Sequence, residues 1–243
     1  MTETDSTHDA GSDSASRDGS DGDDSALALV DVTKRYGETT ALKDLSIEFR
    51  PGTFHGLIGP NGSGKTTLFA LLAGLTRPTS GRIERTGATA TVGYSFQEPR
   101  FYPSLTVREN LEIFRGFADD PPPDAWTETL LEELRLEPAA DRRADELSGG
   151  FRKKLDLGLA LIKRPQYLLL DEPLADVDDS SRRRITAFLD SYREADRTVV
   201  VSTHNVAAFA DQLDRLSVVV DGDLRYDGPP ADDVVAQYRA LLD

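Results

Sequence analysis

FHGLIGPNGSGKTTLFALLAGL, residues 54–75, decides the fold of this 243-residue chain. FHGLIG predicts a short buried strand, and KTTLFALLAGL predicts a mostly apolar helix. Between them, GPNGSGKT fits the pattern G-x-x-x-x-G-K-[ST]. Its glycines allow successive backbone N–H groups to turn inward and hold phosphates at the start of a helix. The stretch therefore predicts a nucleotide-binding loop, which by itself is shared by kinases, GTPases, motors and transporter ATPases.

The loop and the first helical turn supply the expected phosphate ligands. Lys65 is expected to reach the β- and γ-phosphates, and the Thr66 hydroxyl is expected to ligate Mg²⁺. The full set of nucleotide-binding residues expected here is Gly59, Asn61, Gly62, Ser63, Gly64, Lys65, Thr66 and Thr67.

Strands and helices alternate over the rest of the chain. Strands are predicted at 27–37, 42–52, 91–96, 166–171, 197–203 and 215–221, and helices in FRKKLDLGLALIKR and SSRRRITAFLDSYRE. Near-continuous Val and Leu in the later strands is typical of a mostly parallel sheet covered on both faces. Asp221-Gly222 predicts a hairpin turn. Residues 104–147 have a helical pattern, with Thr106 and Glu109 forming a capping box. They predict a small helical subdomain inserted at about 98–150.

A second chemical motif is YLLLDEP, residues 167–173. The apolar strand delivers Asp171 to its carboxyl end, where an open α/β sheet binds ligands, so Asp171 is expected to complete the Mg²⁺ site. Glu172 follows directly and is the candidate base for the water that attacks the γ-phosphorus. Paired acids at a strand end are often solvated turn residues, and only the presence of the phosphate loop favours catalysis.

Three further features are weak singly. LSGG (147–150) predicts the start of a helix with Ser148 as cap and with glycines open to an anion. His204 follows the strand RTVVVST, and Gln97 follows TVGYSF. Both are expected at the carboxyl edge of the sheet, where Gln97 could ligate Mg²⁺ or position water. A capped turn, a structural histidine and an exposed glutamine are the ordinary alternatives.

Taken together, these motifs resemble the ATP-binding-cassette (ABC) ATPase family over about residues 27–228. The resemblance implies that Tyr36 stacks on adenine, that Gln97 is the Q-loop glutamine and that His204 is the switch histidine. LSGG becomes the signature motif, so Ser148, Gly149 and Gly150 are expected to bind nucleotide. Asp178 becomes the D-loop aspartate. The implied fold is an α/β P-loop cassette with a mostly parallel core, an antiparallel β subdomain and a small helical subdomain.

The sequence departs from the family pattern at two places. Phe151 follows LSGG where glutamine is usual, and the D-loop reads ADVD (175–178), with Ala175 where a hydroxyl or amide is common. The catalytic residues are expected to be intact. The two departures concern communication between two sites across a dimer.

The resemblance also implies partners. Two cassettes, identical or different, are expected to pack head to tail with ATP and Mg²⁺ at their interface, docked on a membrane permease subunit. The chain would then be cytoplasmic and peripheral on the inner face of the cell membrane. An exporter of the ABC-2 kind is favoured by LSGGFRKK. An importer cassette is the main alternative, and a soluble ABC ATPase, such as one in iron–sulfur cluster assembly, is another.

Composition excludes several classes of protein. The chain has no cysteine, so a disulfide, a Cys-ligated metal or a thiol nucleophile is impossible. Apolar runs such as ALLAGL (70–75) fall far short of the roughly 18 residues of a membrane span, and no secretory signal is expected. The net charge of −15 argues against a nucleic-acid partner.

The charge is unevenly distributed. Residues 1–25 contain eight acids, one arginine and no Leu, Ile, Val or Phe, and they predict a disordered acidic tail before one ABC domain at 26–243. The whole chain has 29 Asp to 14 Glu and 22 Arg to 6 Lys. This bias favours adaptation to a salt-rich cytoplasm, as in a halophile, over an ordinary acidic protein of a GC-rich genome.

Overall fold

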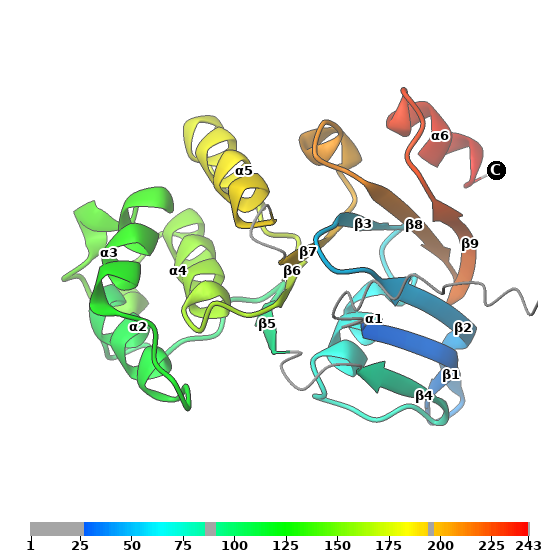
Figure 1. The fold of residues 1–243 in the computed structure, drawn as a ribbon, viewed down its shortest axis with the longest axis horizontal. Helices are drawn as coiled ribbons and strands as arrows, with labels where there is room; N and C mark the ends of the chain where they lie inside the picture. Colours follow the sequence, from blue (N-terminus) through cyan, green and yellow to red (C-terminus); the bar gives the residue numbers. More distant parts are fainter. Residues whose placement is uncertain (1–26, 86–90, 194–196, 243) are drawn as a thin grey trace, which may run out of the picture.

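The computed structural model describes residues 27–85, 91–193 and 197–242, which build two sheets with helices packed on them (Figure 1). The predicted acidic tail at 1–25 lies outside the described residues. The strands are β1 (Leu27–Tyr36), β2 (Thr39–Phe49), β3 (Phe54–Ile58), β4 (Ser80–Arg85), β5 (Val92–Ser95), β6 (Tyr167–Asp171), β7 (Thr198–Thr203), β8 (Arg215–Val220) and β9 (Asp223–Gly228). The α-helices are α1 (Lys65–Leu72), α2 (Val107–Gly116), α3 (Asp124–Glu133), α4 (Gly149–Leu161), α5 (Asp179–Arg193) and α6 (Val234–Ala240). Short 3₁₀ turns are η1 (Glu137–Ala139), η2 (Ala144–Glu146) and η3 (Val206–Phe209).

The smaller sheet is antiparallel, in the order β2–β1–β4. The sequence predicts β1 and β2 but not β4, whose residues SGRIER are largely exposed and carry little apolar pattern. Leu27 pairs with Phe49 on one side and with Arg85 on the other, so β4 completes the sheet along β1.

The larger sheet has the order β5–β6–β7–β3–β8–β9 and is parallel except for β9. β3, which leads into the phosphate loop, therefore lies between two strands from much later in the sequence. The hairpin predicted at Asp221-Gly222 is confirmed, because both residues have positive φ (51° and 82°) and join β8 to the antiparallel β9.

Both faces of the larger sheet are covered. On one side α1 lies between the two sheets, and α5 and α6 lie on the other side (Figure 1). Alternate residues of each strand face opposite cores: Leu168 and Leu170 pack with α5, whereas Tyr167 and Leu169 pack with α1 and the antiparallel sheet. This two-sided burial explains the continuous apolar strands of the sequence, and the predicted fold class is confirmed.

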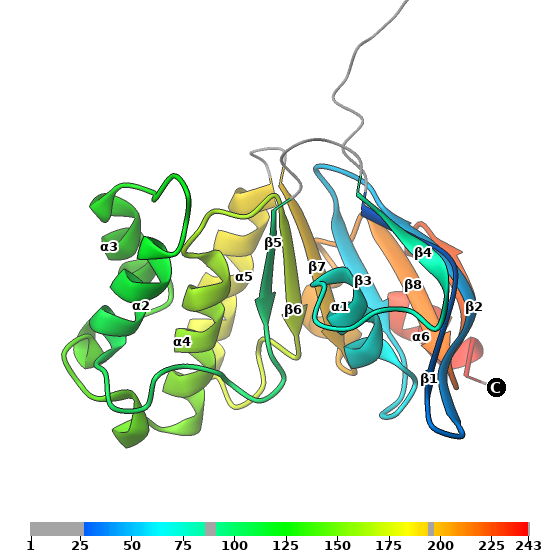
Figure 2. The same cartoon turned by 90° about the horizontal axis from the view of Figure 1, so that it is seen from below.

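Helices α2, α3 and α4 lie together beyond the β5 edge of the sheet (Figure 2). The predicted capping box is present: the N–H of Glu109 donates to Thr106 Oγ1, and the N–H of Thr106 donates to the Glu109 carboxylate. α4 contacts α2 and α3 on one side and β5 and β6 on the other, so it joins the helical group to the sheet. The limits of a separate subdomain at 98–150 stay a prediction.

Two long-range backbone hydrogen bonds of Gly222 hold the phosphate loop in place. The N–H of Gly222, in the β8–β9 turn, donates to the carbonyl of Ser63 at 3.0 Å, and the carbonyl of Gly222 accepts from the N–H of Lys43 at 2.9 Å. The turn therefore ties the loop to β2. No helix within the described ranges is long and apolar enough to span a bilayer.

Candidate functional site

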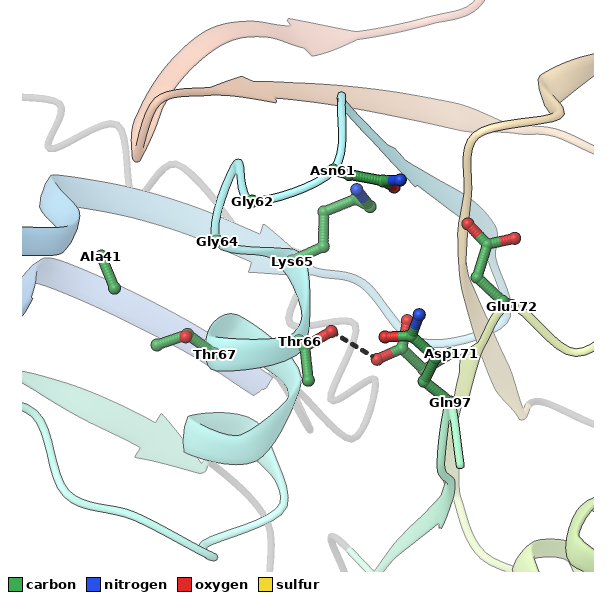
Figure 3. Close-up of a pocket in the computed structure, with 10 residues that line it drawn as sticks. All are labelled: Ala41, Asn61, Gly62, Gly64, Lys65, Thr66, Thr67, Gln97, Asp171 and Glu172. Atoms are coloured by element: carbon green, nitrogen blue, oxygen red, sulfur yellow. Dashed lines mark hydrogen bonds between the residues drawn. The ribbon is translucent and has the colours of Figure 1, made fainter. Parts of the chain in front are cut away.

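The loop between β3 and α1 forms one wall of a hollow of about 380 Å³ (Figure 3). Gly64 immediately precedes α1 with φ of 108°, and a Cβ there would lie 2.6 Å from the carbonyl oxygen of Ala41. No L-residue with a side chain fits this position, which explains the glycine before Lys65. Asn61, Gly62, Thr66 and Thr67 also line the hollow with Lys65. Gly59 and the buried Ser63 lie behind it rather than on its surface.

Lys65 is held inside the loop. Its ammonium donates to the carbonyls of Gly59 at 2.7 Å and Pro60 at 3.0 Å. Burial lowers the pKa of Lys65, and the nearby charges of Glu172 and Asp171 oppose that shift. A phosphate placed in the loop would act in the same direction as these acids and stabilise the ammonium.

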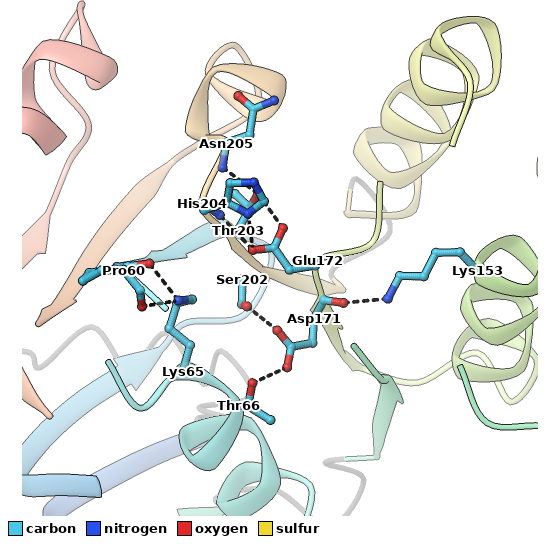
Figure 4. A network of polar contacts seen from close by, with 11 residues as sticks. Pro60, Lys65, Thr66, Lys153, Asp171, Glu172, Ser202, Thr203, His204 and Asn205 are labelled. Carbon is cyan, nitrogen blue, oxygen red and sulfur yellow. Dashed lines mark hydrogen bonds and ion pairs between the residues drawn. The ribbon is translucent and has the colours of Figure 1, made fainter. Parts of the chain in front are cut away.

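Asp171 ends β6 opposite the loop (Figure 4). Its carboxylate is almost fully buried and accepts hydrogen bonds from Ser202 Oγ at 2.5 Å and from Thr66 Oγ1 at 2.7 Å. The Tyr94 hydroxyl lies 3.5 Å away, and burial together with Asp171 raises the pKa of Tyr94 above its ordinary range. Thr66 and Asp171, each predicted to contribute to the Mg²⁺ site, are thus in direct contact.

The donor set fits Mg²⁺. Thr66, Asp171 and the exposed Gln97 present a hydroxyl, a carboxylate and an amide to the same hollow, and hard oxygen atoms are the ligands that Mg²⁺ prefers (Figure 3). Over the described ranges, no three His, Asp or Glu side chains cluster in a way that could hold a metal ion. A metal here would therefore need oxygen atoms from the bound phosphates or from water as well.

Glu172 has a strained backbone, with φ of 49°. Oε1 accepts from the N–H of His204 at 2.9 Å and lies 2.8 Å from its Nδ1, and Oε2 accepts from Thr203 Oγ1 at 3.2 Å (Figure 4). Because a carboxylate only accepts, Nδ1 carries the proton of this pair. The Glu172 side chain is 15% exposed and the His204 side chain 70% exposed. His204 therefore orients Glu172 while its Nε2 remains available.

The signature residues line a different hollow of about 470 Å³. Ser148, Gly149 and Gly150 lie there beside Asp176 and Asp178 of the loop before α5. A Cβ on Gly150 would lie 2.6 Å from the carbonyl oxygen of Asp176, so glycine allows α4 to pack on that loop. One chain thus does not bring the signature residues into the Lys65 hollow.

Ser148 occupies the predicted N-cap position of α4, but its side chain does not act as a cap. Ser148 is the residue before α4, but its hydroxyl makes no hydrogen bond to the first turn. The first N–H groups of α4 therefore keep no side-chain cap, which is the condition for binding an external anion. Asp178, in contrast, caps α5 by accepting from Ser181 and Ser180, and these hydrogen bonds hold its pKa well below the ordinary range.

Tyr36 ends β1 and is 51% exposed, with the Lys34 ammonium 4.7 Å from its ring centroid. It does not line the phosphate hollow, so its contact with adenine stays a prediction. Phe151 packs beneath the Lys154 ammonium at 4.1 Å from the ring centroid. The phenylalanine that replaces the usual glutamine is therefore held against its own helix.

Sequence reasoning missed Lys153 and Asp156. Both are buried in α4 and hydrogen-bonded to the segment around Gln97. The available signal was an aspartate between Leu155 and Leu157, which contradicts a purely apolar helix face.

Comparisons with known proteins agree with this geometry. Residues 42–175 match the family model described as ABC transporter. The Nod factor export ATP-binding protein I of Paraburkholderia xenovorans is 36% identical over 86% of this chain and 72% of that protein. The xylose/arabinose import ATP-binding protein of Haloferax volcanii is 35% identical over 84% of this chain and 56% of that protein. A dimeric ATP-binding cassette in a post-hydrolysis state, bound to ADP and Pi, superposes with a TM-score of 0.73 at 27% identity, over 84% of this chain and 98% of that one.

Proposed function

The chain belongs to the ABC transporter family as an ATP-binding, ATP-hydrolysing subunit, and we propose that it powers export through a separate membrane permease. The observation that carries the proposal is the meeting of Lys65, Thr66, Asp171 and Glu172 around one hollow. These residues supply a cation for phosphate, two oxygen ligands for a metal and a base.

The hydrogen bonds of Glu172 support a distinct task for each of its two carboxylate oxygens. Oε1 is occupied by two hydrogen-bonding groups of His204, whereas Oε2 accepts a longer hydrogen bond from Thr203 Oγ1 at 3.2 Å. Oε2 is therefore the oxygen that takes the proton of the attacking water. The two hydrogen-bonding groups of His204 hold the carboxylate of Glu172 in place, and Glu172 lines the phosphate hollow. Mg²⁺, held by Thr66, Asp171 and Gln97, would neutralise negative charge on the phosphate oxygens.

We also propose that two cassettes complete each site. Ser148 and the uncapped N–H groups of α4 lie in their own hollow, so they would face the γ-phosphate held by a second cassette. ATP then joins the two cassettes and its hydrolysis releases them. The dimeric, ADP- and Pi-bound cassette is a structural precedent for this arrangement.

The permease is proposed to dock beside Gln97. A groove of about 910 Å³ runs between β5 and the helical group. Its aromatic lining includes Phe96, Phe101, Tyr102, Phe114 and Phe117, and Tyr102 and Phe117 are exposed. Docking there would bind the chain to the membrane as a peripheral subunit. Nucleic acid is not proposed as a partner, given the net charge of −15.

The proposed direction of transport rests on one short motif rather than on overall similarity. Export and import relatives match almost equally, at 36% and 35% identity, so overall similarity does not separate them. The variant signature LSGGFRKK favours an ABC-2 exporter over an importer cassette. A soluble ABC ATPase of iron–sulfur cluster assembly is the second candidate, and it would leave the aromatic groove without a membrane partner.

The catalytic assignment is tested by Glu172→Gln. The amide preserves shape but takes no proton, so MgATP binding is retained while turnover falls by on the order of 10²- to 10⁴-fold. Light scattering during gel filtration with MgATP should then detect a trapped dimer.

Lys65→Ala is the matched control and should neither bind tightly nor dimerise. Near-normal hydrolysis by Glu172→Gln would remove Glu172 as the base.

A further inference from the structure

Lys153 and Asp156 are buried charges that lie one turn apart on α4; Lys154 is buried as well, but it donates to the carbonyl of Arg135, away from the Gln97 segment. Lys153 is 3% exposed and Asp156 is 2% exposed, on a helix whose other buried residues are mostly apolar. Buried charges are costly unless each is hydrogen-bonded, so their partners show what they do. The partners of Lys153 and Asp156 lie on the segment around Gln97 or at the end of β6.

Lys153 joins the ends of two strands. Its ammonium donates to the carbonyl of Asp171 at 2.7 Å (Figure 4). It also donates to the carbonyl of Phe96 at 2.6 Å and lies 3.5 Å from the carbonyl of Gln97. Its three protons are therefore directed at backbone oxygens rather than at a carboxylate. One side chain thereby links the Gln97 segment to the end of β6, where Asp171 and Glu172 lie, and fixes the distance between them.

Asp156 holds the same segment from both sides of Gln97. It accepts from Ser95 Oγ at 2.6 Å and from the N–H groups of Phe96 and Arg100, each at 2.8 Å. Burial raises the pKa of Asp156, and these hydrogen bonds oppose the shift. The Gln97 side chain itself stays exposed in the phosphate hollow.

The same helix begins at the signature motif. Gly149 is the first residue of α4, and Lys153 and Asp156 follow one and two turns later. A helix is stiff over this length, so the position of Ser148 follows the position of the two charges.

We propose that Lys153 and Asp156 form a clamp that makes Gln97, the signature motif and the end of β6 move as one body. They are positioning residues: neither lines the phosphate hollow, and they act through Gln97. The proposal rests on the proposed function, in which Gln97 faces the metal and the attacking water. Its consequence is that weakening the clamp slows hydrolysis without weakening nucleotide binding by Lys65.

The test compares Lys153→Met, which removes the donors, with Lys153→Gln, which keeps two of them. Leu155→Val is the control for a loss of packing on the same helix. For Lys153→Met, kcat should fall by on the order of 10- to 100-fold with KM for MgATP nearly unchanged, as expected for a misplaced group. Lys153→Gln should recover part of the loss, and Leu155→Val should lower Tm while keeping kcat. A kcat loss in Leu155→Val equal to that of Lys153→Met would overturn the proposal.

A double mutant shows whether the clamp acts through Gln97. If it does, Gln97→Ala combined with Lys153→Met should be no slower than Gln97→Ala alone. Multiplied losses, or a Gln97→Ala protein as fast as the wild type, would refute this route.

Hydrogen exchange without nucleotide separates the clamp from the ATPase assignment. The amides of Phe96 and Arg100 should exchange faster in Lys153→Met and Asp156→Ala but not in Leu155→Val. If the wild type proved unable to hydrolyse ATP, the proposed function would fail and exchange would still decide the clamp. Unchanged exchange in both variants would refute it.

Discussion

Lowering the pH from 7 to 4 should destabilise the fold through His55. This side chain is fully buried in β3, and its Nε2 lies 2.7 Å from Ser217 Oγ. Because the Ser217 hydroxyl donates to Asp227, Nε2 must be the protonated nitrogen of the ring. Nδ1 is buried and has no hydrogen-bond partner among the residues that the structure describes, on a ring whose centroid is 4.8 Å from that of Phe49. A second proton would place a charge there with no acceptor.

The size of this loss of stability follows from the pKa of His55. Burial lowers the pKa of His55 from 6.5 to about 4, with Asp227 opposing the shift and Arg215 adding to it. The unfolded chain takes up the proton first, so stability is complete above pH 6.5 and is lost as the pH falls toward 4. At about 1.4 kcal/mol per pKa unit, the loss reaches about 3 kcal/mol in total and about 2 kcal/mol by pH 5.

Urea denaturation followed by fluorescence of the single tryptophan, Trp126, measures this loss, since Trp126 packs against Phe188 and Tyr192. Other groups also titrate, so the reference is His55→Phe, which cannot take up a proton. The free energy of unfolding of the wild type should fall about 3 kcal/mol further than that of the variant between pH 7 and pH 4. Parallel pH curves for the two proteins would show that the burial argument is wrong.

Two further predictions concern the dimer and the charge. Ser148→Arg should bind nucleotide but not hydrolyse it. Mixing it with Lys65→Ala should restore part of the ATPase activity, because one site of the heterodimer then has an intact phosphate loop and an intact signature motif. Strong hydrolysis by Ser148→Arg alone would contradict the head-to-tail arrangement. Transfer from 1 M to 0.01 M salt should lower Tm reversibly, because the Debye length grows from about 3 Å to about 30 Å and repulsion among the many aspartates increases; an equal Tm at both salts would contradict the halophile hypothesis.

The sequence predicts those elements whose residues satisfy a local rule. Val199–Val201 in β7 and Leu168–Leu170 in β6 are apolar because both faces of the sheet are covered. β4 and α6 are not predicted, because both elements are short, mix polar with apolar residues and are partly exposed. They form by pairing or packing with elements that are distant in the sequence.

The candidate site likewise contains residues that the sequence predicts and residues that it does not. Lys65, Thr66, Asp171 and Glu172 lie in short motifs with known chemistry, and the structure brings them together. The clamp residue Asp156 could not be assigned, because its partners lie about 60 positions earlier and only the packing of α4 on β5 reveals them.

The order of strands in the larger sheet has a consequence for synthesis on the ribosome. Phe54 pairs with Val199, and the carbonyl of Ser63 accepts from the N–H of Gly222. In each case the partner is synthesised roughly 150 residues later, which at about 5–20 residues per second is a delay of roughly 8 to 30 s. During that time both edges of β3 lack their native neighbours, and its apolar residues are open to wrong pairing. The nascent chain therefore contains the phosphate-loop sequence long before the β8–β9 turn that holds Ser63 has been synthesised.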